Sequence, residues 1–395
     1  MTVHHKLIAD IRLHSPYLTW AQNGASPDEI KDEILRTLRP HFLNPSVLAN
    51  FPISILAHEA VTLRNIQNDP WASSMFVGVL SEHREALAQN KAECIAAIEA
   101  WHDSVVRAMS EFTSIYLMEV DKADLGMEEF RLEVIRNVGG LLEACLQPQL
   151  KALLHLVRIR RNHKCGVKDI VGLRFGAVVD ELHQTLRLPA IVAPPPWCLN
   201  LHHWRNIAQH HSAVIDGSRV TCRYRIGKTE HQVSLTRVEL LAVQRRMQDV
   251  LGIVRAARSV FVADNSEALS DRDFQPPRPE IEFLFMVVGI ASQGFDVVDV
   301  DISGDAAHLI VQDATDMDPD VRRLHASQFL VTTWAHFPRR EIRVTYIDRS
   351  GRRRLEATAA GSDCEQIAEE KLPFETLADR VTFRVLDRDP RGGGV

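Results

Sequence analysis

The sequence predicts a mainly α-helical protein with a C-terminal α+β domain, and three observations lead to this fold class. Apolar residues recur at three- and four-residue spacing from Ser26 to about Arg187, which is typical of helices with one buried face. A β-hairpin pattern at 218–235 is followed by one more long helical pattern. After about residue 280, strand and helix patterns alternate with short connections.

The composition fits an ordinary globular protein. The chain has 395 residues, enough for two or three domains, of which 45% are hydrophobic and 25% charged. A formal net charge of −6 provides no overall basic field, so any binding to nucleic acid requires a local patch. The cysteines form no CxxC pair, which argues against a zinc ribbon or a small disulfide scaffold and indicates reduced thiols.

The chain is expected to be cytoplasmic. Its first residues, MTVHHKLIADIRLHSPYL, contain no continuous apolar segment of the kind found in secretory signals. The longest apolar run, FLFMVVGIA, is far too short to span a membrane. No membrane association is therefore predicted.

Residues 1–125 are predicted to form an N-terminal helical region. In SPDEIKDEILRTL, Ser26 is the expected N-cap and Pro27 the first helical residue. The apolar positions that follow, Ile30, Ile34 and Leu38, lie on one helical face. A long helix is expected over about 80–119, and the turn-forming sequence EVDKADLGMEEF follows it.

Residues 126–263 are predicted to form a central up-and-down helical bundle with a short β-hairpin. A long helical pattern covers about 127–160, and Pro148 should kink or divide it. A further helix is expected in VKDIVGLRFGAVVDELHQTL, and Pro196 is placed to begin the next one.

The hairpin and the last helix of this region have clear end signals. SRVTCRYRIGKTEHQVSL contains two short β-type runs around Gly227-Lys228. Thr236 is the expected N-cap of the helix that follows, RVELLAVQRRMQDVLGIVRAARSVFV.

Residues 264–280 are rich in polar residues and proline and are predicted to be a linker, and residues 281–395 to be a small α+β domain. Its expected elements are a helix in EIEFLFMVVGIASQ, paired strands in FDVVDVDIS and AAHLIVQD, a helix in DPDVRRLHASQFLVTTWAHF, a hairpin turning at Ser350-Gly351, and a final strand in VTFRVLD. The tail RDPRGGGV is expected to be disordered.

Polar residues are concentrated in WCLNLHHWRNIAQHHSAVIDG, residues 197–217. On a helix over 197–211, Asn206 and His210 are one turn apart and share a face. Leu201, Trp204 and Ala208 form a separate apolar stripe suited to core packing. Arg205 lies about 140° from His210, so its long side chain must reach around the helix to meet a common ligand.

An arginine five residues before a histidine is not informative by itself, because chance produces one or two such pairs in a chain of this composition. The sequence contains three of them. The pair Arg36 and His41 is interrupted by Pro40, and the pair Arg158 and His163 lies in a basic run at an expected helix end. Only Arg205 is followed by asparagine and lies in a predicted helix after two long ones.

The sequence RNIAQH, followed by a hairpin and another long helix, resembles the HEPN superfamily over roughly residues 127–262. The hallmark of that superfamily is an Arg-Asn/His/Asp-x3-His motif late in a helical bundle. The resemblance implies a metal-independent endoribonuclease in which two domains place their motifs across a cleft. It assigns catalysis to Arg205, Asn206 and His210, implies a homodimer, and requires no cofactor.

These residue types suit RNA cleavage on chemical grounds. Histidine moves protons near neutral pH and can assist attack of the 2′-hydroxyl on the adjacent phosphate. Arginine can stabilise the added negative charge through paired hydrogen bonds. Asn206 could orient either the imidazole or the phosphate. A solvated or capping helix face is the alternative interpretation of the three residues.

Neighbouring residues are candidates for contacting nucleic acid. They are His202, His203 and His211 on the same helix, and Arg219, Arg223 and Arg225, whose even spacing on a strand directs them to one side. A charged edge strand that resists aggregation explains the arginines equally well. Cys198 and His202 are spaced as a metal-ligand pair, but no second pair is evident, so no metal is expected.

The function that these observations favour is an RNA-cleaving toxin or antiviral defence effector. An antitoxin or sensor partner is expected to bind through the C-terminal domain. A non-catalytic scaffold that binds nucleotide or nucleic acid, or dimerises, through the same helix is the first alternative. A protein-interaction adaptor whose C-terminal domain carries the function is the second.

Overall fold

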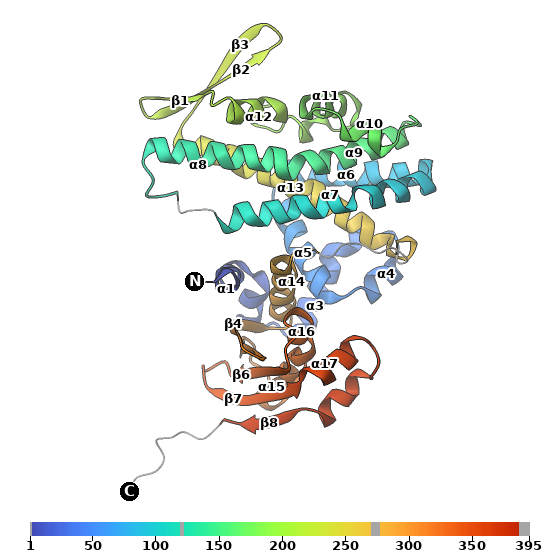
Figure 1. Cartoon of the computed structure of the whole chain (residues 1–395), viewed down its shortest axis with the longest axis vertical. Coiled ribbons are helices and arrows are strands. Elements are labelled where there is room, and N and C mark those ends of the chain that lie inside the picture. The colour runs from blue at the N-terminus through green and yellow to red at the C-terminus, as the bar shows by residue number, and fades with distance from the viewer. Residues whose placement is uncertain (1, 119–121, 270–276, 387–395) are drawn as a thin grey trace. The chain divides into compact units, whose positions relative to one another are not determined.

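The computed structural model describes residues 2–118, 122–269 and 277–386, which form two compact units (Figure 1). The sheet unit comprises Met1–Pro40, Phe51–Val61 and Arg278–Val395. The bundle unit comprises His41–Asn50 and Thr62–Pro277. Helix α5 (Ile53–Gln67) begins in the first unit and ends in the second.

This division differs from the predicted boundaries of 1–125, 126–263 and 281–395. The first forty residues belong with the C-terminal strands, and helices at 70–117 belong with the bundle. Periodicity identifies the buried face of a helix but not its partner, so the sequence could not assign these helices to a unit. Only part of the predicted linker at 264–280 lies within the described residues.

The bundle unit is built around five long helical segments, which are α6 (Pro70–Gln89), α7 (Lys91–Leu117), α8 (Met127–Gly140), α9 (Gln147–Arg160) and α13 (Arg237–Asp264). Helix α6 packs on both α9 and α13, and α7 packs on α9. Short α4 (Pro45–Asn50) also contacts α13. Their facing side chains form a core of leucine, valine, alanine and phenylalanine.

The long helical pattern at 127–160 is divided, as Pro148 predicts. Helix α8 passes into a π-helical segment, η2 (Leu141–Leu146), before α9 begins at Gln147. A proline inside a helix has no N–H to donate to the carbonyl four residues earlier, and its ring crowds that carbonyl. The wider turn just before Pro148 accommodates this loss.

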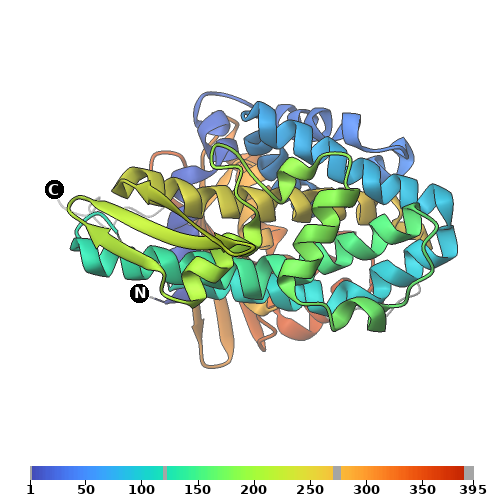
Figure 2. The ribbon, with the colours of Figure 1, turned by 90° about the horizontal axis from the view of Figure 1, so that it is seen from above.

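Three short helices and a small sheet cover one side of the bundle (Figures 1 and 2). The helices are α10 (Val167–Val171), α11 (Phe175–Thr185) and α12 (Leu201–Gln209), so the single helix expected over 167–186 is two. The sheet is antiparallel, with β1 (Ala213–Asp216), β2 (Arg219–Ile226) and β3 (Thr229–Leu235) in that order. The predicted hairpin and its turn at Gly227-Lys228 are confirmed.

Helix end signals in the sequence are confirmed in both units. Thr236 and Glu239 form a capping box at the start of α13, and Ser26 and Glu29 form another at the start of α3 (Pro27–Leu38). The apolar stripe of α3 is buried as predicted. Short 3-10 segments lie at Arg39–His41, Pro189–Ile191, Ser266–Ala268 and Phe374–Asp379.

The sheet unit contains a five-stranded sheet in sequence order, comprising β4 (Phe295–Ser303), β5 (Ala306–Asp313), β6 (Glu341–Ile347), β7 (Arg353–Ala360) and β8 (Thr382–Val385). All neighbours are antiparallel except β5 and β6, which are parallel. The crossover between β5 and β6 is helical, and α1 (Val3–His14), α2 (Pro16–Gln22) and α14 (Pro279–Ser292) complete the packing.

The predicted α+β character of the C-terminal residues is confirmed, with two differences. The helix expected over DPDVRRLHASQFLVTTWAHF is divided at Gln328 into α15 (Pro319–Ser327) and α16 (Phe329–His336). Helix α17 (Gly361–Ala368) was not predicted. The tail RDPRGGGV lies outside the described residues. Within those residues, no helix combines the length and apolarity needed to cross a lipid bilayer.

A buried histidine in the bundle should make its stability depend on pH. His83 is 2% exposed and donates from Nδ1 to the carbonyl of Val79 at 2.8 Å. Burial, with a smaller contribution from the nearby Arg258, lowers the pKa of His83 from 6.5 to about 4. The unfolded chain therefore binds a proton at higher pH than the folded chain does, and stability present above pH 6.5 is lost as the pH falls toward 4.

We expect His83→Gln to reduce the loss of unfolding free energy between pH 6.5 and 4 by roughly 3 kcal/mol. Urea denaturation at a series of pH values measures this difference. His183→Gln, at an exposed position of the same unit, is the control and should leave the pH dependence unchanged. Equal pH dependence of the His83 variant and the unmodified chain would contradict the assignment.

Candidate functional site

The candidate site lies at the end of α12, which is shorter than the helix predicted over 197–211. The helix begins at Leu201 instead of Pro196 and ends at Gln209. Cys198 precedes it with a φ of 49°, and His211 follows it with a φ of 50°. These left-handed residues mark both ends of the segment. Cys198 therefore lies outside the helix that contains His202, and the two residues are not one helical turn apart as a metal-ligand pair would require.

The apolar face of α12 is buried as predicted. Leu201 and Trp204 are fully buried and Ala208 is 8% exposed. This face packs against α8, where Gly139 allows a close approach. A Cβ atom at Gly139 would lie 3.1 Å from the Cβ of Ala208, closer than nearly all real contacts. The packing of this face leaves the polar residues on the sides and at the end of the helix.

Arg205 is held in place by two neighbours. Its Nε donates to Oε1 of Glu143 at 2.5 Å, and its Nη1 donates to Oδ1 of Asn206 at 3.2 Å. The side chains of Arg205 and Glu143 are about one-third exposed, at 31% and 35%. Within the described parts of the chain, Nη2 of Arg205 has no hydrogen-bond partner, so one edge of the guanidinium is available to a ligand.

Glu143 is a site residue that the sequence did not indicate. It lies in the π-helical segment, 62 residues before Arg205. No spacing rule connects residues so far apart. A signal was nevertheless present, because π-helical turns are frequent at functional sites and Pro148 predicted a helical irregularity here.

His210 and His211 end the helix with exposed imidazoles. His210 is the C-cap residue, and its backbone N–H donates to the carbonyl of Asn206. The imidazole of His210 makes no hydrogen bond or ion pair within the described residues. Asn206 and His210 are thus one turn apart, as predicted, although His210 caps the helix instead of lying within it.

A groove of about 700 Å³ runs beside this helix end. Glu143 and His211 line it, together with residues of α8 that include Gly139 and Gly140. Its polar lining also includes Glu129, Arg131, Glu133, Arg136 and Gln209. Arg205, Asn206 and His210 are not among the lining residues. The motif therefore adjoins the groove through the ion pair of Arg205 with Glu143.

His202 and His203 lie one turn before Arg205 and Asn206 on α12, where His202 faces Asp180 of α11 and His203 faces Tyr224 of the small sheet. His203 is 8% exposed, and burial lowers its pKa to about 4. The two imidazole rings are 4.0 Å apart, and Nδ1 of His202 lies 3.4 Å from a carboxylate oxygen of Asp180. His203 is thus a neutral interior residue that packs the helix against the sheet, with no surface available for nucleic acid.

The three arginines predicted to share one side of a strand do so in β2. Arg219, Arg223 and Arg225 are all exposed, whereas Cys222 between them is fully buried. Within the described residues no group of three or more His, Cys, Asp or Glu side chains is arranged to hold a metal ion. The candidate site is built from the Arg205 guanidinium, the Glu143 carboxylate, the Asn206 amide and the imidazoles of His210 and His211.

The two other arginine–histidine pairs with the same spacing have different surroundings. Arg158 binds both carboxylate oxygens of Glu181, at 2.7 and 2.6 Å. Arg36 binds Glu33 one turn earlier at 2.8 Å. Both guanidinium groups are thus engaged by carboxylates, that of Arg158 with 12% of its side chain exposed and that of Arg36 with 77%. The structure distinguishes them from Arg205, which combines a carboxylate with an amide beside a groove.

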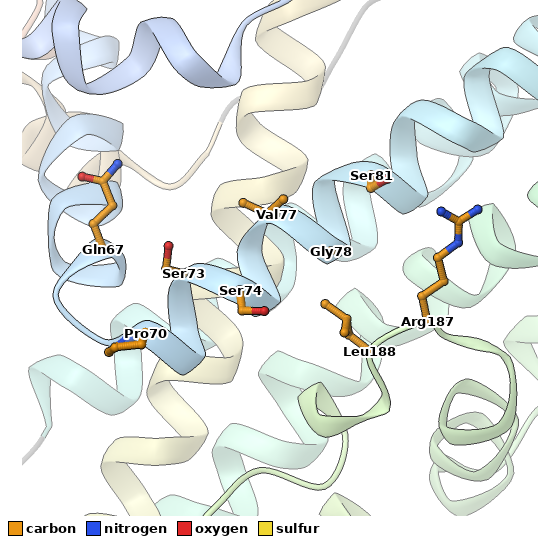
Figure 3. A pocket seen from close by; sticks show the side chains of 9 residues that line it. All are labelled: Gln67, Pro70, Ser73, Ser74, Val77, Gly78, Ser81, Arg187 and Leu188. Carbon is orange, nitrogen blue, oxygen red and sulfur yellow. The ribbon is translucent and has the colours of Figure 1, made fainter.

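A second groove of about 800 Å³ lies along α6 (Figure 3). Ser73, Ser74 and Ser81 line it, and Leu188 lies against Gly78. A Cβ at Gly78 would lie 2.5 Å from Cδ1 of Leu188, so a larger residue here would require the end of the Leu188 side chain to shift. Among the described residues that line it, Arg187 is the one with a charged side chain, and it is paired with Glu85 at 2.6 Å. The described lining of this groove therefore offers no histidine or carboxylate for proton transfer.

Comparison of the chain with protein-family models, with curated proteins and with solved structures finds no match.

Proposed function

We propose that the chain is a metal-independent endoribonuclease whose active centre lies at the end of α12. The supporting observation is the guanidinium of Arg205, which Glu143 and Asn206 hold with one edge free, on the helix that ends at the exposed His210. The resemblance of RNIAQH to the HEPN motif supports the same assignment. A phosphodiester is the ligand that best matches an oriented guanidinium and an exposed imidazole carried at the end of the same helix.

The proposed reaction is an internal phosphoryl transfer. The 2′-oxygen of one ribose attacks the adjacent phosphorus, and the bond from phosphorus to the 5′-oxygen of the next nucleotide breaks. One group accepts the proton of the 2′-hydroxyl, and another gives a proton to the departing 5′-oxygen. The products are a 2′,3′-cyclic phosphate and a 5′-hydroxyl. Arg205 stabilises the charge that accumulates on the phosphoryl oxygens.

Two proton-transfer groups are needed, and a homodimer would supply them. In the proposed dimer the motifs of two copies face one RNA strand, so that His210 of each copy serves one step. Such a site should lose activity on dilution below the dimer dissociation constant. Light scattering and the rate of cleavage measured over the same concentrations test this expectation, and a monomer with a constant specific activity would contradict it.

The basic experiment is incubation of the purified full chain with single-stranded RNA in EDTA. Fragments should appear, and His210→Ala and Arg205→Ala chains should produce few of them. Tight binding without fragments would instead favour the non-catalytic scaffold. Neither binding nor cleavage would favour the protein-interaction adaptor.

Glu143 should position Arg205. Substitutions of Glu143 distinguish the orientation of the Arg205 guanidinium from its affinity for the RNA phosphate. We expect Glu143→Ala to lower kcat about tenfold, because the guanidinium loses a charge-assisted hydrogen bond that fixes it. KM should not rise, because removal of a carboxylate makes the cation more available to phosphate. Glu143→Gln keeps an acceptor oxygen and should lose less. A rise in KM with unchanged kcat in Glu143→Ala would contradict the positioning role.

The proposed cellular role is that of a toxin or antiviral defence effector located in the cytoplasm. The sheet unit would then receive an antitoxin or a sensor partner. Induced expression of the intact chain should arrest growth, whereas the His210→Ala chain should not. Equal growth with both chains in cells that contain cleaved RNA would remove the toxin role and leave the nuclease activity standing.

A further inference from the structure

The hairpin formed by β2 and β3 carries two arginines, Arg223 and Arg225, that form no ion pair with any acidic group among the described residues. Arg219 donates to Ser234 and lies 3.3 Å from Glu239. In the portions of the chain that the structure describes, the guanidinium groups of Arg223 and Arg225 have no hydrogen-bond or ion-pair partner. The register places Glu230 opposite Arg225, but the two form no ion pair.

Strand geometry places these two cations on one side. Residues two apart on a strand point to the same face and lie about 6.8 Å apart. Cys222, on the opposite face, is fully buried, so Arg223 and Arg225 point outward. Lys228 at the turn is also exposed and extends the positive charge to the tip of the hairpin.

The hairpin is fixed next to the candidate site. The backbone N–H of Arg223 donates to the carbonyl of Ser212 at 2.9 Å, and Ser212 is two residues after His210. The first of the two cations is therefore attached to the segment that leaves the end of α12. In Figure 1 the hairpin continues from there beyond the helices of the bundle unit.

A column of aromatic rings on the other face holds the hairpin against α12. The ring of His203 lies 5.4 Å from that of Tyr224, and Tyr224 stacks on its cross-strand partner His231 at 5.6 Å with an angle of 20° between the rings. Such cross-strand pairs stabilise a two-stranded ribbon. The column fixes the orientation of the strand. The backbone that carries Arg223 and Arg225 is therefore already ordered before a ligand binds.

We propose that this hairpin is an arm that holds single-stranded RNA by its phosphates, with Arg223 and Arg225 as the contacts. The proposal rests on the proposed nuclease function, for which the arm would deliver the strand to the end of α12. Charge complementarity identifies the ligand, since guanidinium groups bind phosphate through paired hydrogen bonds. Their spacing along the strand is comparable to that of successive phosphates in an extended polynucleotide. Contacts of this kind are independent of base sequence.

The test measures binding apart from cleavage. The full chain carrying His210→Ala is titrated against a fluorescein-labelled single-stranded RNA, with fluorescence anisotropy recorded at several salt concentrations. Adding Arg223→Ala and Arg225→Ala should weaken binding about tenfold. The slope of log affinity against log salt should fall in magnitude by about 0.7 for each phosphate that the arm no longer binds. Lysine at both positions keeps the charges and should retain most of the binding.

The matched control is Arg161→Ala with Arg245→Ala, which removes two exposed arginines of the same unit, at the end of α9 and within α13. Equal affinity and salt slope in the control and the arm variant would overturn the proposal. Displacement of the RNA by polyglutamate, added at the same concentration of negative charges as the RNA, would also overturn the proposal. That result would identify an acidic protein segment as the ligand. RNA binding that depends on the arm, in a chain that never cleaves RNA, would overturn the nuclease function and leave the arm intact.

Discussion

Replacing His210 with alanine is expected to lower the rate of RNA cleavage by about 10²- to 10⁴-fold, which is the usual contribution of a group that transfers a proton in the transition state. The protein should remain folded, because the imidazole is exposed and makes no hydrogen bond or ion pair of its own within the described residues. Single-turnover rates with excess protein isolate the chemical step. RNA affinity should change little, since the hairpin arginines remain.

The chain contains a matched control for this substitution. His163 is exposed, belongs to the same unit and follows Arg158 at the same spacing as His210 follows Arg205. Arg158, however, is occupied by both oxygens of Glu181. His163→Ala should therefore cleave RNA as fast as the unmodified chain. Equal rates for His210→Ala and the unmodified chain would show that the end of α12 is a solvated helix face.

Replacing Arg322 with methionine is expected to destabilise the sheet unit by about 3–5 kcal/mol, the cost of leaving a buried charge without its partner. Arg322 is completely buried, and its Nε lies 3.2 Å from both carboxylate oxygens of Asp313. Its Nη2 donates to the carbonyl of Gln293 at 2.8 Å, and the guanidinium lies 3.6 Å from the ring centroid of Phe295. Removing it leaves the Asp313 carboxylate buried without a cation to balance its charge.

A second substitution at Asp313 tests whether the unpaired carboxylate causes the loss of stability. Tyr346 and Thr315 also donate to this carboxylate, and burial next to it raises the pKa of the Tyr346 phenol. The double variant Arg322→Met with Asp313→Asn removes both charges and should recover part of the lost stability. Arg323→Ala, at a partly exposed position of the same helix, should change stability by less than about 0.5 kcal/mol.

Urea denaturation followed by circular dichroism measures these differences in the unfolding free energy of the sheet unit. A loss for Arg322→Met as small as that for Arg323→Ala would show that the ion pair does not hold the sheet and its helices together.

Local features of the fold were predictable because they depend on neighbouring residues. The caps at Ser26 and Thr236, the disruption near Pro148 and the turn at Gly227 each follow from the geometry of a few adjacent residues. The apolar stripe of α12 was predictable for the same reason. The beginning of α12 was not, since Pro196 can start a helix but the residues after it adopt a turn.

Features that depend on tertiary packing were not predictable from the same patterns. Nothing in the periodicity of the N-terminal helices shows which of them pack on the C-terminal sheet. The ion pair of Arg205 with Glu143 joins two segments that only the folded bundle brings together. Histidines in and next to α12 show the same limit. The sequence did not distinguish His203, whose ring is buried, from His210, whose ring is exposed at the end of the helix.

The most direct test of the nuclease assignment is the chemical nature of the new ends. Mass spectrometry of fragments produced by the full chain in EDTA should find a 2′,3′-cyclic phosphate on one fragment and a 5′-hydroxyl on the other, and both should be missing with the His210→Ala chain. Fragments ending in a 3′-hydroxyl and a 5′-phosphate, or intact RNA after prolonged incubation, would contradict the account.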